Sequence, residues 1–249
     1  MCNFFRFCIF IIIFIMPSTI QAKQPLTIGV GNFPPFFIEK DESGLFLDIT
    51  KAIFSNLPEY EVSFIFMSNS RLLHEINSGN RIDVACNIFK NSSVEAYLSE
   101  PIFRYTDVAI SKKSQHLTLN SVSDLQGVSI AAYQGAMDLL GDNFKTMALS
   151  NPIYSEHPHP KDTTNLLVSD LTDVRIGDIH IFYHDLKHKF YKDSESGNIN
   201  NYSVHYLWPD VYSHMAFKDE ALRDAVNVEI QKLTQDGTFA KIYQQYKIQ

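Results

Sequence analysis

The stretch that most constrains the fold runs from Leu26 to Phe37. Leu26–Val30 is a short apolar run bounded by glycine, which is typical of a buried strand. The strand cannot continue through Pro34-Pro35, because proline donates no hydrogen bond to a sheet. A rigid loop therefore follows, and it carries three aromatic residues: Phe33, Phe36 and Phe37. Since ligands bind at the carboxyl ends of strands in α/β sheets, we expect Phe33 to face a cleft and the other two rings to fill the core.

After this loop the apolar residues alternate between helical and strand spacing. Residues 45–57 and 71–77 have the spacing of helices, whereas residues 61–67 and 82–88 have the spacing of strands. The order strand–helix–strand–helix–strand predicts a mainly parallel sheet that is covered on both faces. Residues 105–111 are expected to form a strand that leads out of this first unit.

A second unit of the same kind begins at Ser121. Its expected strands cover residues 128–133, 177–183 and 202–207, and its expected helices cover residues 136–144 and 163–171. The chain closes with a strand at residues 212–217 and helices at residues 220–233 and 238–246. The sequence therefore predicts an α/β protein with two units of similar construction.

Residues 1–22 have the pattern of a secretory signal peptide. Arg6 supplies a positive charge, residues 7–16 form an apolar segment, and residues 20–22 offer a cleavage site. The apolar segment is shorter than the about 20 residues that cross a membrane. We therefore expect cleavage after Ala22 and location in the periplasm.

Composition narrows the function of the remaining 227 residues of the 249-residue chain. Loss of Arg6 changes the formal net charge from −7 to −8, and no stretch is dense in lysine and arginine. Nucleic-acid binding is therefore not expected. Cys86 is the single cysteine left after cleavage, so no intramolecular disulfide can form. Within its apolar run, Cys86 is expected to be a small buried residue rather than a catalytic thiol.

The order of these pieces resembles the family 3 periplasmic solute-binding proteins, whose best-known members bind amino acids for ABC importers. The resemblance spans residues 25–249 and rests on these stretches: Ile28–Phe36, Gly44–Ile49, Ile76–Asp83, Ser99–Pro101, Ser123–Gly127, Phe217–Asp219 and Leu233–Thr238. It implies the periplasmic binding protein type II fold, with two α/β lobes joined by two hinge strands. Lobe 1 would comprise residues 23–111 plus 207–249, and lobe 2 residues 112–206.

The resemblance implies a monomer that closes on a small polar metabolite, an amino acid or a related compound, and delivers it to an ABC permease. A ligand sensor that contacts a membrane receptor would have the same sequence features. A few relatives are periplasmic dehydratases that act on cyclic acids, and Asp48 and Glu95 are the acids such an enzyme could use here. We expect a binding protein and no enzyme.

The usual amino-acid pocket of the family is not intact in this chain. In amino-acid-binding relatives an arginine binds the ligand carboxylate and an aspartate in the second lobe binds its ammonium group. The arginine position falls at Ser92 or at Glu95, depending on the direction of counting, and neither can bind a carboxylate. The aspartate position falls at Tyr183, with Asp185 two residues further on.

The resemblance and the spacing together give the candidate ligand-binding residues. From lobe 1 they are Phe33, Asn69, Arg71, Asn87 and Lys90; from lobe 2 they are Tyr133, Gly135, Tyr183 and Asp185. The amide and phenol groups would hydrogen-bond a polar ligand of any charge. A solvated surface charge is the alternative interpretation for Arg71, Lys90 and Asp185.

Several histidines invite a metal-binding hypothesis: His157, His159, His180, His184 and His188. Their spacing matches no recognised ligand pattern, so we expect solvent-exposed imidazoles instead. No phosphate-binding loop or hydrolase pattern is present either. The sequence predicts no metal and no cofactor.

Overall fold

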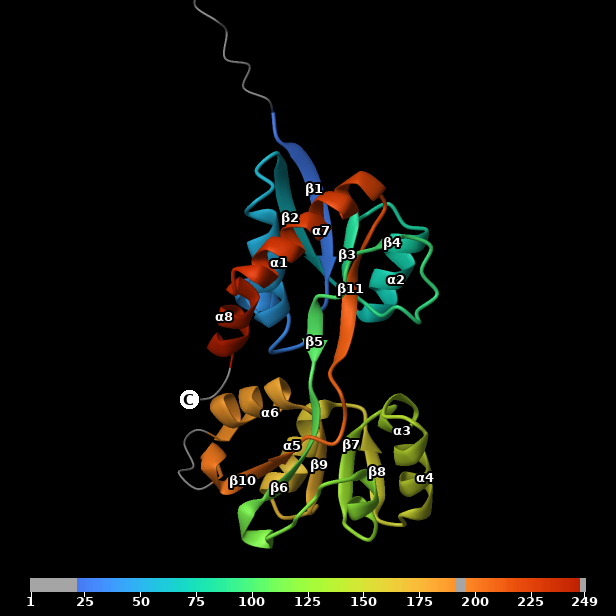
Figure 1. Cartoon of the computed structure of the whole chain (residues 1–249), viewed down its shortest axis with the longest axis vertical. Helices are drawn as coiled ribbons and strands as arrows, with labels where there is room; N and C mark the ends of the chain where they lie inside the picture. The colour runs from blue at the N-terminus through green and yellow to red at the C-terminus, as the bar shows by residue number, and fades with distance from the viewer. Residues whose placement is uncertain (1–21, 191–195, 247–249) are drawn as a thin grey trace, which may run out of the picture.

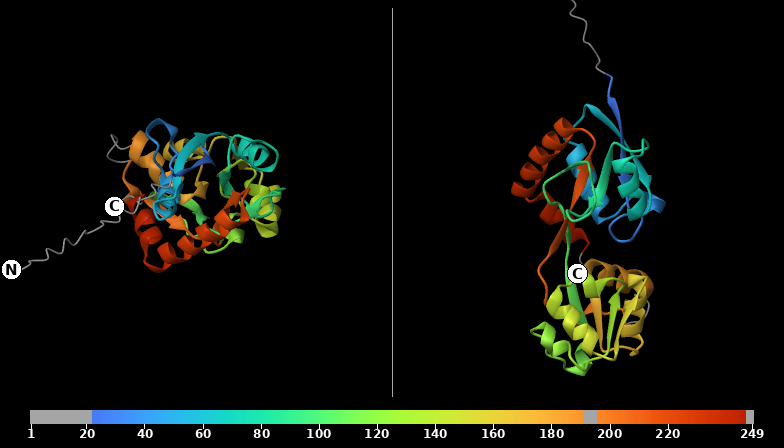
Figure 2. Two further views of the ribbon diagram at one scale, coloured as in Figure 1. Left: turned by 90° about the horizontal axis from the view of Figure 1, so that it is seen from above. Right: turned by 90° about the vertical axis from the view of Figure 1, so that its right-hand side faces the viewer.

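The structure, a computed structural model, describes residues 22–190 and 196–246. The predicted signal peptide lies outside the described residues, except for Ala22. Two α/β lobes lie one above the other and are connected by extended segments (Figure 1). The right-hand view of Figure 2, turned by 90° about the vertical axis, also shows the two lobes as separate bodies. Within the described ranges, no helix has the length and apolar character needed to cross a membrane.

The first lobe is built on a sheet with the strand order β2-β1-β3-β11-β4, and β5 pairs with β11. Its strands are β1 (Gln24–Val30), β2 (Tyr60–Phe66), β3 (Val84–Ile88), β4 (Tyr97–Leu98), β5 (Phe103–Tyr105) and β11 (Val211–Phe217). The first three strands are parallel, as the alternation of helices and strands predicts, and β11 is antiparallel to β3.

Helices cover both faces of this sheet. Three helices pack on one face: α1 (Leu45–Phe54), α7 (Glu220–Gln235) and α8 (Thr238–Gln245). The other face is covered by α2 (Asn69–Asn77), through Leu72 and Ile76. Phe36 and Phe37 are fully buried in the first of these cores, which confirms their expected role. Cys86 is also fully buried, as predicted, and burial raises the pKa of its thiol to about 12.

The second lobe has a five-stranded sheet with the order β10-β6-β9-β7-β8. Its strands are β6 (Asp107–Lys112), β7 (Ile130–Tyr133), β8 (Tyr154–His157), β9 (Val174–Asp178) and β10 (Tyr202–His205). One face packs against α3 (Ala136–Leu139) and α4 (Asp142–Ser150). The opposite face packs against α5 (Pro160–Val168) and α6 (Ile179–Asp185), and a π-helical turn, Leu186–Phe190, follows α6.

The prediction of a strand at residues 177–183 is wrong. β9 ends at Asp178, whose side chain accepts hydrogen bonds from the N–H groups of His180 and Ile181 and so starts α6. Such an N-cap satisfies donors that a new helix leaves without partners. Ile179 and Phe182 both face the core of the second lobe, which is helical spacing rather than strand alternation.

Two other predicted elements are each divided into two separate elements in the structure. The helix expected at residues 136–144 is interrupted by Gly141, whose φ of 91° belongs to the left-handed region. The strand expected at residues 105–111 separates into the end of β5, in the first sheet, and β6, in the second. Strand pairing thus associates residues 107–112 with the second sheet, and the lobe boundaries at 111/112 and 206/207 stay a prediction.

Candidate functional site

The carboxyl ends of the central strands of each lobe face the other lobe. β1 and β3 end at Val30 and Ile88 in the first lobe, and β7 and β9 end at Tyr133 and Asp178 in the second. The chain crosses between the sheets beside these ends, from β5 to β6 and from β10 to β11 (Figure 1). Because loops at the carboxyl ends of strands bind ligands, the region between the lobes is the candidate site.

The two lobes touch through α6. The ring centroid of His180 lies 6.3 Å from that of Phe36 and 5.8 Å from that of Tyr243. Its Nδ1 atom lies 3.4 Å from a carboxylate oxygen of Asp178. The expectation of an exposed imidazole is therefore wrong for His180, which is only 3% exposed. Its ring is buried because α6, which the sequence pattern did not predict, carries it against the first lobe.

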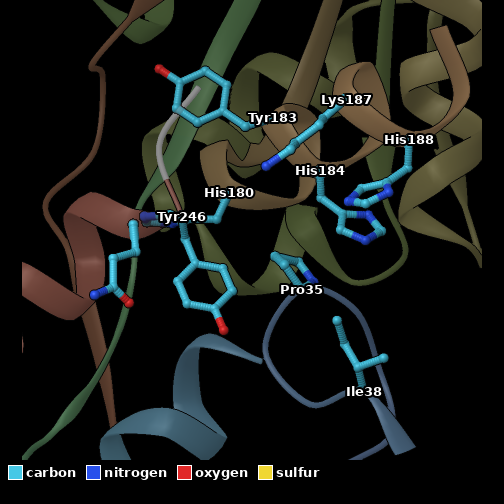
Figure 3. A pocket seen from close by; sticks show the side chains of 9 residues that line it. Pro35, Ile38, His180, Tyr183, His184, Lys187, His188 and Tyr246 are labelled. Carbon is cyan, nitrogen blue, oxygen red and sulfur yellow. The ribbon is translucent and has the colours of Figure 1, made fainter. Parts of the chain in front are cut away.

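A pocket of about 130 Å³ opens beside this contact. Both lobes line it, through Pro35, Ile38, Gln245 and Tyr246 on one side and His180, Tyr183, His184, Lys187 and His188 on the other. Figure 3 shows His184 and His188 side by side above the loop that carries Pro35, and their ring centroids are 4.4 Å apart. The pocket places Tyr183, a candidate ligand-binding residue, at the junction of the lobes.

Phe33 lies in the loop that follows β1. Its ring is partly buried and packs edge-on against Phe36 and Phe37, at centroid distances of 5.7 Å and 5.8 Å. The Phe33 carbonyl oxygen accepts hydrogen bonds of 3.1 Å from the N–H groups of both. These contacts hold the loop in place and leave Phe33 the most exposed of the three rings.

Arg71 is held by a neighbour that the sequence analysis missed. Its guanidinium forms an ion pair with Glu75 one helical turn further along α2. Glu75 is buried, which opposes ionisation, but the Arg81 backbone N–H and the Arg71 guanidinium together lower its pKa. The Arg71 side chain remains 49% exposed. The i, i+4 spacing of arginine and glutamate could have indicated this pair.

Asn69 and Lys90 are exposed residues at the same end of the first sheet. Asn69 is the first residue of α2, directly after the helix-capping Ser68, and Lys90 follows β3 by two residues. Both lie where loops leave the carboxyl ends of parallel strands, and their role as ligand-binding residues stays a prediction.

Asn87 contacts β5 and β11, the two strands of the first sheet that adjoin the chain crossings. Its side-chain Oδ1 atom accepts a 2.7 Å hydrogen bond from the Tyr105 hydroxyl and another of 2.7 Å from the Ser213 hydroxyl. The residue is 3% exposed and its φ of 65° lies in the left-handed region. Its Nδ2 atom is buried and has no hydrogen-bond partner among the described residues.

Tyr133 lies at the carboxyl end of β7 and contacts a residue that the sequence analysis did not select. Its hydroxyl donates a 3.0 Å hydrogen bond to Asp107, the first residue of β6. Burial and the nearby Asp178 carboxylate raise the pKa of Asp107 to about 6, although the Tyr133 hydrogen bond and Arg175 act in the opposite direction. Nothing in the local sequence around Asp107 distinguishes it, since β6 otherwise has the pattern of an ordinary buried strand.

Gly135 is the N-cap residue of α3 and has a φ of 89°. Its N–H donates a 2.7 Å hydrogen bond to Glu156, and the Met137 N–H donates another of 2.9 Å to the same carboxylate. Glu156 also accepts from the Tyr154 hydroxyl at 2.8 Å. Burial opposes ionisation of Glu156, but these hydrogen bonds lower its pKa overall. The backbone donors at the start of α3 are therefore occupied by a carboxylate of the protein.

Asp185 lies inside the second lobe. It is 3% exposed, so the alternative of a solvated surface charge does not apply to it. Its charge acts on Arg175, which is fully buried in β9, and partly offsets the lowering of the pKa of Arg175 by desolvation. Arg175 donates to the carbonyl oxygens of Gly177 and Asp178, each at 3.1 Å. The role of Asp185 as a direct ligand-binding residue stays a prediction.

The groups at the facing ends of the sheets are polar and hydrogen-bonding. Residues 22–190 and 196–246 contain no group of three histidine, cysteine or acidic residues arranged to hold a metal ion. Asp48 and Glu95 are the two acids that a dehydratase could use. Asp48 accepts a 2.6 Å hydrogen bond from the Tyr246 hydroxyl. Glu95 is exposed in the segment that follows β3. The facing ends of the sheets instead bring together amide, phenol and carboxylate groups, which can hydrogen-bond a small polar molecule.

Comparison with known proteins defines the class. The sequence profile of the bacterial extracellular solute-binding proteins, family 3, matches residues 26–249. The chain is 27% identical over 237 residues to the L-cystine-binding protein TcyJ of Bacillus subtilis, covering 90% of this chain and 84% of that protein. The protein belongs to family 3 of the bacterial extracellular solute-binding proteins.

Solved structures share the fold at low identity. The probable amino-acid ABC transporter extracellular-binding protein ytmK of Bacillus subtilis superposes with a TM-score of 0.71 at 18% identity, covering 90% of this chain and 99% of that one. The L-arginine-bound substrate-binding protein AbpA of Streptococcus pneumoniae gives a TM-score of 0.61 at 22% identity, covering 89% and 94%. These similarities confirm the two-lobed α/β fold of type II periplasmic binding proteins.

Proposed function

We propose that this protein captures an amino acid or a closely related polar compound between its lobes and delivers it to an ABC importer. The observation that carries this proposal is that the carboxyl ends of both central sheets face each other across two chain crossings. Tyr133 on one side and Asn87 on the other lie at these ends. The relative TcyJ binds L-cystine, which supports a search among amino acids.

The protein acts as a binding protein rather than an enzyme, in the periplasm and as a monomer. Family membership supports the binding role. Neither acid that a dehydratase could use is supported by its surroundings, because Asp48 is held by Tyr246 and Glu95 is exposed. A perturbed acid enclosed in a cleft is what such catalysis needs.

A thermal-shift panel tests the proposal. The compounds are the twenty common L-amino acids, L-cystine, polyamines, organic acids and short peptides, with isothermal titration of each compound that raises the melting temperature. A ligand present at 100 times its dissociation constant stabilises the folded state by about 2.7 kcal/mol. We expect at least one amino acid to do so. If only polyamines, organic acids or peptides bind, the amino-acid assignment is wrong, although the binding function is retained.

Transport is tested separately in the organism. Deletion of the gene should reduce uptake of the radiolabelled ligand, and plasmid-borne protein should restore it. Unchanged uptake together with a lost transcriptional response to the same ligand would instead assign the protein to a membrane receptor.

A further inference from the structure

The pocket beside His180 has a lining whose charge differs from that of the whole chain. One lysine and three histidines line it from the second lobe: His180, His184, Lys187 and His188. Among the described residues, no aspartate or glutamate lines it, although the chain carries a formal net charge of −7. Such a local excess of positive and protonatable groups attracts anions.

Two of these histidines are held close together. His184 lies in the last turn of α6 and His188 in the π-helical turn that follows, and their ring centroids are 4.4 Å apart. Figure 3 shows the Lys187 side chain extending from the same segment toward His180. Two imidazoles at this distance repel each other when both are protonated, and an anion beside them offsets that repulsion.

The carboxylates next to this lining have other partners. Asp178 accepts hydrogen bonds from the backbone at the start of α6, Asp48 accepts one from the Tyr246 hydroxyl, and Asp185 acts on the buried arginine of β9. Lys187 is exposed and makes no hydrogen bond or ion pair within the part of the chain that the structure describes. Its ammonium group is therefore available to an anion in the pocket.

The size of the pocket suits an ion better than a metabolite. Its volume is about 130 Å³. Sites for drug-sized ligands measure about 300–1,000 Å³, and a cavity of about 150 Å³ accepts one benzene molecule. The Gln245 amide lines the pocket from the first lobe, and the Tyr183 hydroxyl lines it from the second. Burial raises the pKa of Tyr183, so its hydroxyl stays a neutral donor.

Buried rings separate this pocket from the facing strand ends. Among the candidate ligand-binding residues, all of which are described, Tyr183 alone lines it. The Tyr105 hydroxyl bonds to Asn87, and the ring centroid of Phe36 lies 5.0 Å from that of Tyr105. On its other side Phe36 contacts His180, at 6.3 Å between ring centroids. The pocket is therefore a second site rather than an extension of the first.

We propose that the pocket beside His180 binds a small inorganic oxyanion, such as sulfate or phosphate. The ammonium group of Lys187 and the protonated imidazoles of His184 and His188 hold the ion from the second lobe. Hydroxyl and amide donors from both lobes complete its hydrogen bonds. The bound ion thereby adds a contact between α6 and the first lobe. This site is independent of the amino-acid site of the proposed function.

Isothermal titration of the mature protein with sodium sulfate tests the proposal, with sodium chloride added to keep the ionic strength constant. Sulfate keeps both of its charges between pH 5.5 and pH 8. We expect saturable binding of one ion at pH 5.5 and about tenfold lower affinity at pH 8, because imidazoles lose their charge over this range. The charged and titratable groups that face the histidines are Tyr183, Lys187 and Tyr246 in the lining and Asp48, Asp178 and Asp185 next to it.

Two variants assign the binding to the named groups. Lys187→Met removes the ammonium group and keeps the length of the side chain, and His188→Gln removes one imidazole and keeps a polar group. Each should lower the sulfate affinity at pH 5.5 by about tenfold, and His188→Gln should also flatten the pH profile. Neither variant should melt at a lower temperature without ligand, since each removes a charge from a cluster of like charges.

The matched control is Lys161→Met, an exposed lysine of α5 that does not line the pocket. Its sulfate affinity should equal that of the wild type. Absence of saturable binding at pH 5.5, or equal affinities of the wild type and both variants, would overturn the proposal. Loss of affinity together with a lower melting temperature in both variants would also overturn it, since structural residues behave in that way.

Two further titrations separate the oxyanion from other occupants. Zn²⁺ that binds more tightly at pH 8 than at pH 5.5, and depends on His188 but not on Lys187, would overturn the oxyanion assignment in favour of a metal, because neutral imidazole is the metal ligand. Glycerol 3-phosphate that binds more tightly than inorganic phosphate would overturn the inorganic ion in favour of a phosphoryl group on a larger molecule. These titrations contain no amino acid, so their failure leaves the proposed function in place, and a failed amino-acid panel leaves the oxyanion site in place.

Discussion

Individual polar side chains show how this site departs from a simple charged pocket. The one arginine among the candidate residues is paired with Glu75, and the backbone donors of Gly135 and Met137 are occupied by Glu156. Two positive features that a ligand carboxylate could use are therefore already engaged by carboxylates of the protein, whereas Lys90 lies exposed after β3. The Asn87 side-chain amide, a donor with no partner in the part of the chain that the structure describes, remains buried beside Tyr105 and Ser213.

Replacement of Arg71 measures how much of its charge remains available. We expect Arg71→Ala to weaken binding of an amino-acid ligand by about tenfold, because the half-exposed guanidinium can still attract a carboxylate. Isothermal titration gives the affinity. Arg71→Ala also leaves Glu75 buried without its ion pair, so the melting temperature should fall.

The control for this experiment is Arg81→Ala, an exposed arginine whose backbone rather than side chain contacts Glu75. Its affinity should not change. Equal affinities of Arg71→Ala and the wild type would remove Arg71 from the site.

Among the elements, the short helix α3 and the strand β8 depend on one carboxylate. Glu156 on β8 accepts from two backbone N–H groups of the loop that begins α3 and from the Tyr154 hydroxyl. The loop after β7 is thereby fixed on the side of the second lobe that faces the first. Helix α6 is fixed comparably by Asp178, which accepts from the N–H groups of His180 and Ile181.

Substitution Glu156→Gln tests this arrangement. A neutral amide keeps one acceptor oxygen and loses charge-assisted bonds, so the free energy of unfolding should fall by about 1–3 kcal/mol at pH 7. The folded pKa of Glu156 is lowered from 4.5, so its stabilisation is present above that value and is lost as pH falls through the folded pKa. Urea unfolding at pH 7 and at pH 3 measures both effects, and the difference between the proteins should shrink at pH 3.

The exposed Glu61 of β2 provides the matched control. Glu61→Gln should unfold at the wild-type urea concentration at both pH values. A Glu156→Gln protein as stable as the wild type at pH 7 would show that Glu156 does not hold the α3 loop.

The whole molecule consists of two sheets joined by two chain crossings, with His180 as a buried contact between the lobes. Hinge closure requires only a few residues at such crossings to change their backbone angles. A ligand that contacts both lobes at once would bring the lobes together.

Small-angle X-ray scattering tests closure directly. The radius of gyration should decrease when a binding amino acid is added at saturating concentration, because the lobes approach each other. An unchanged scattering curve with a fully bound protein would contradict closure on the ligand.

The order of helices and strands followed from the sequence because its causes are local. Apolar periodicity, Pro34-Pro35 and the helix-ending signals act within a few residues, so most elements and the burial of Phe36, Phe37 and Cys86 were predictable. Helix α6 was not predicted, because Ile179 and Ile181 alternate like a strand while the Asp178 cap overrides that pattern.

The contacts between residues of the candidate site could not be predicted from the sequence. Asp107 meets Tyr133, Glu156 meets Gly135, and Asp185 acts on Arg175 across separations that no local pattern encodes. Burial and hydrogen bonding decide whether a carboxylate is solvated, paired or available to a ligand, and both depend on how distant segments pack. The amino-acid sequence therefore specified a two-lobed binding protein, whereas folding determined which of its charged groups remain available between the lobes.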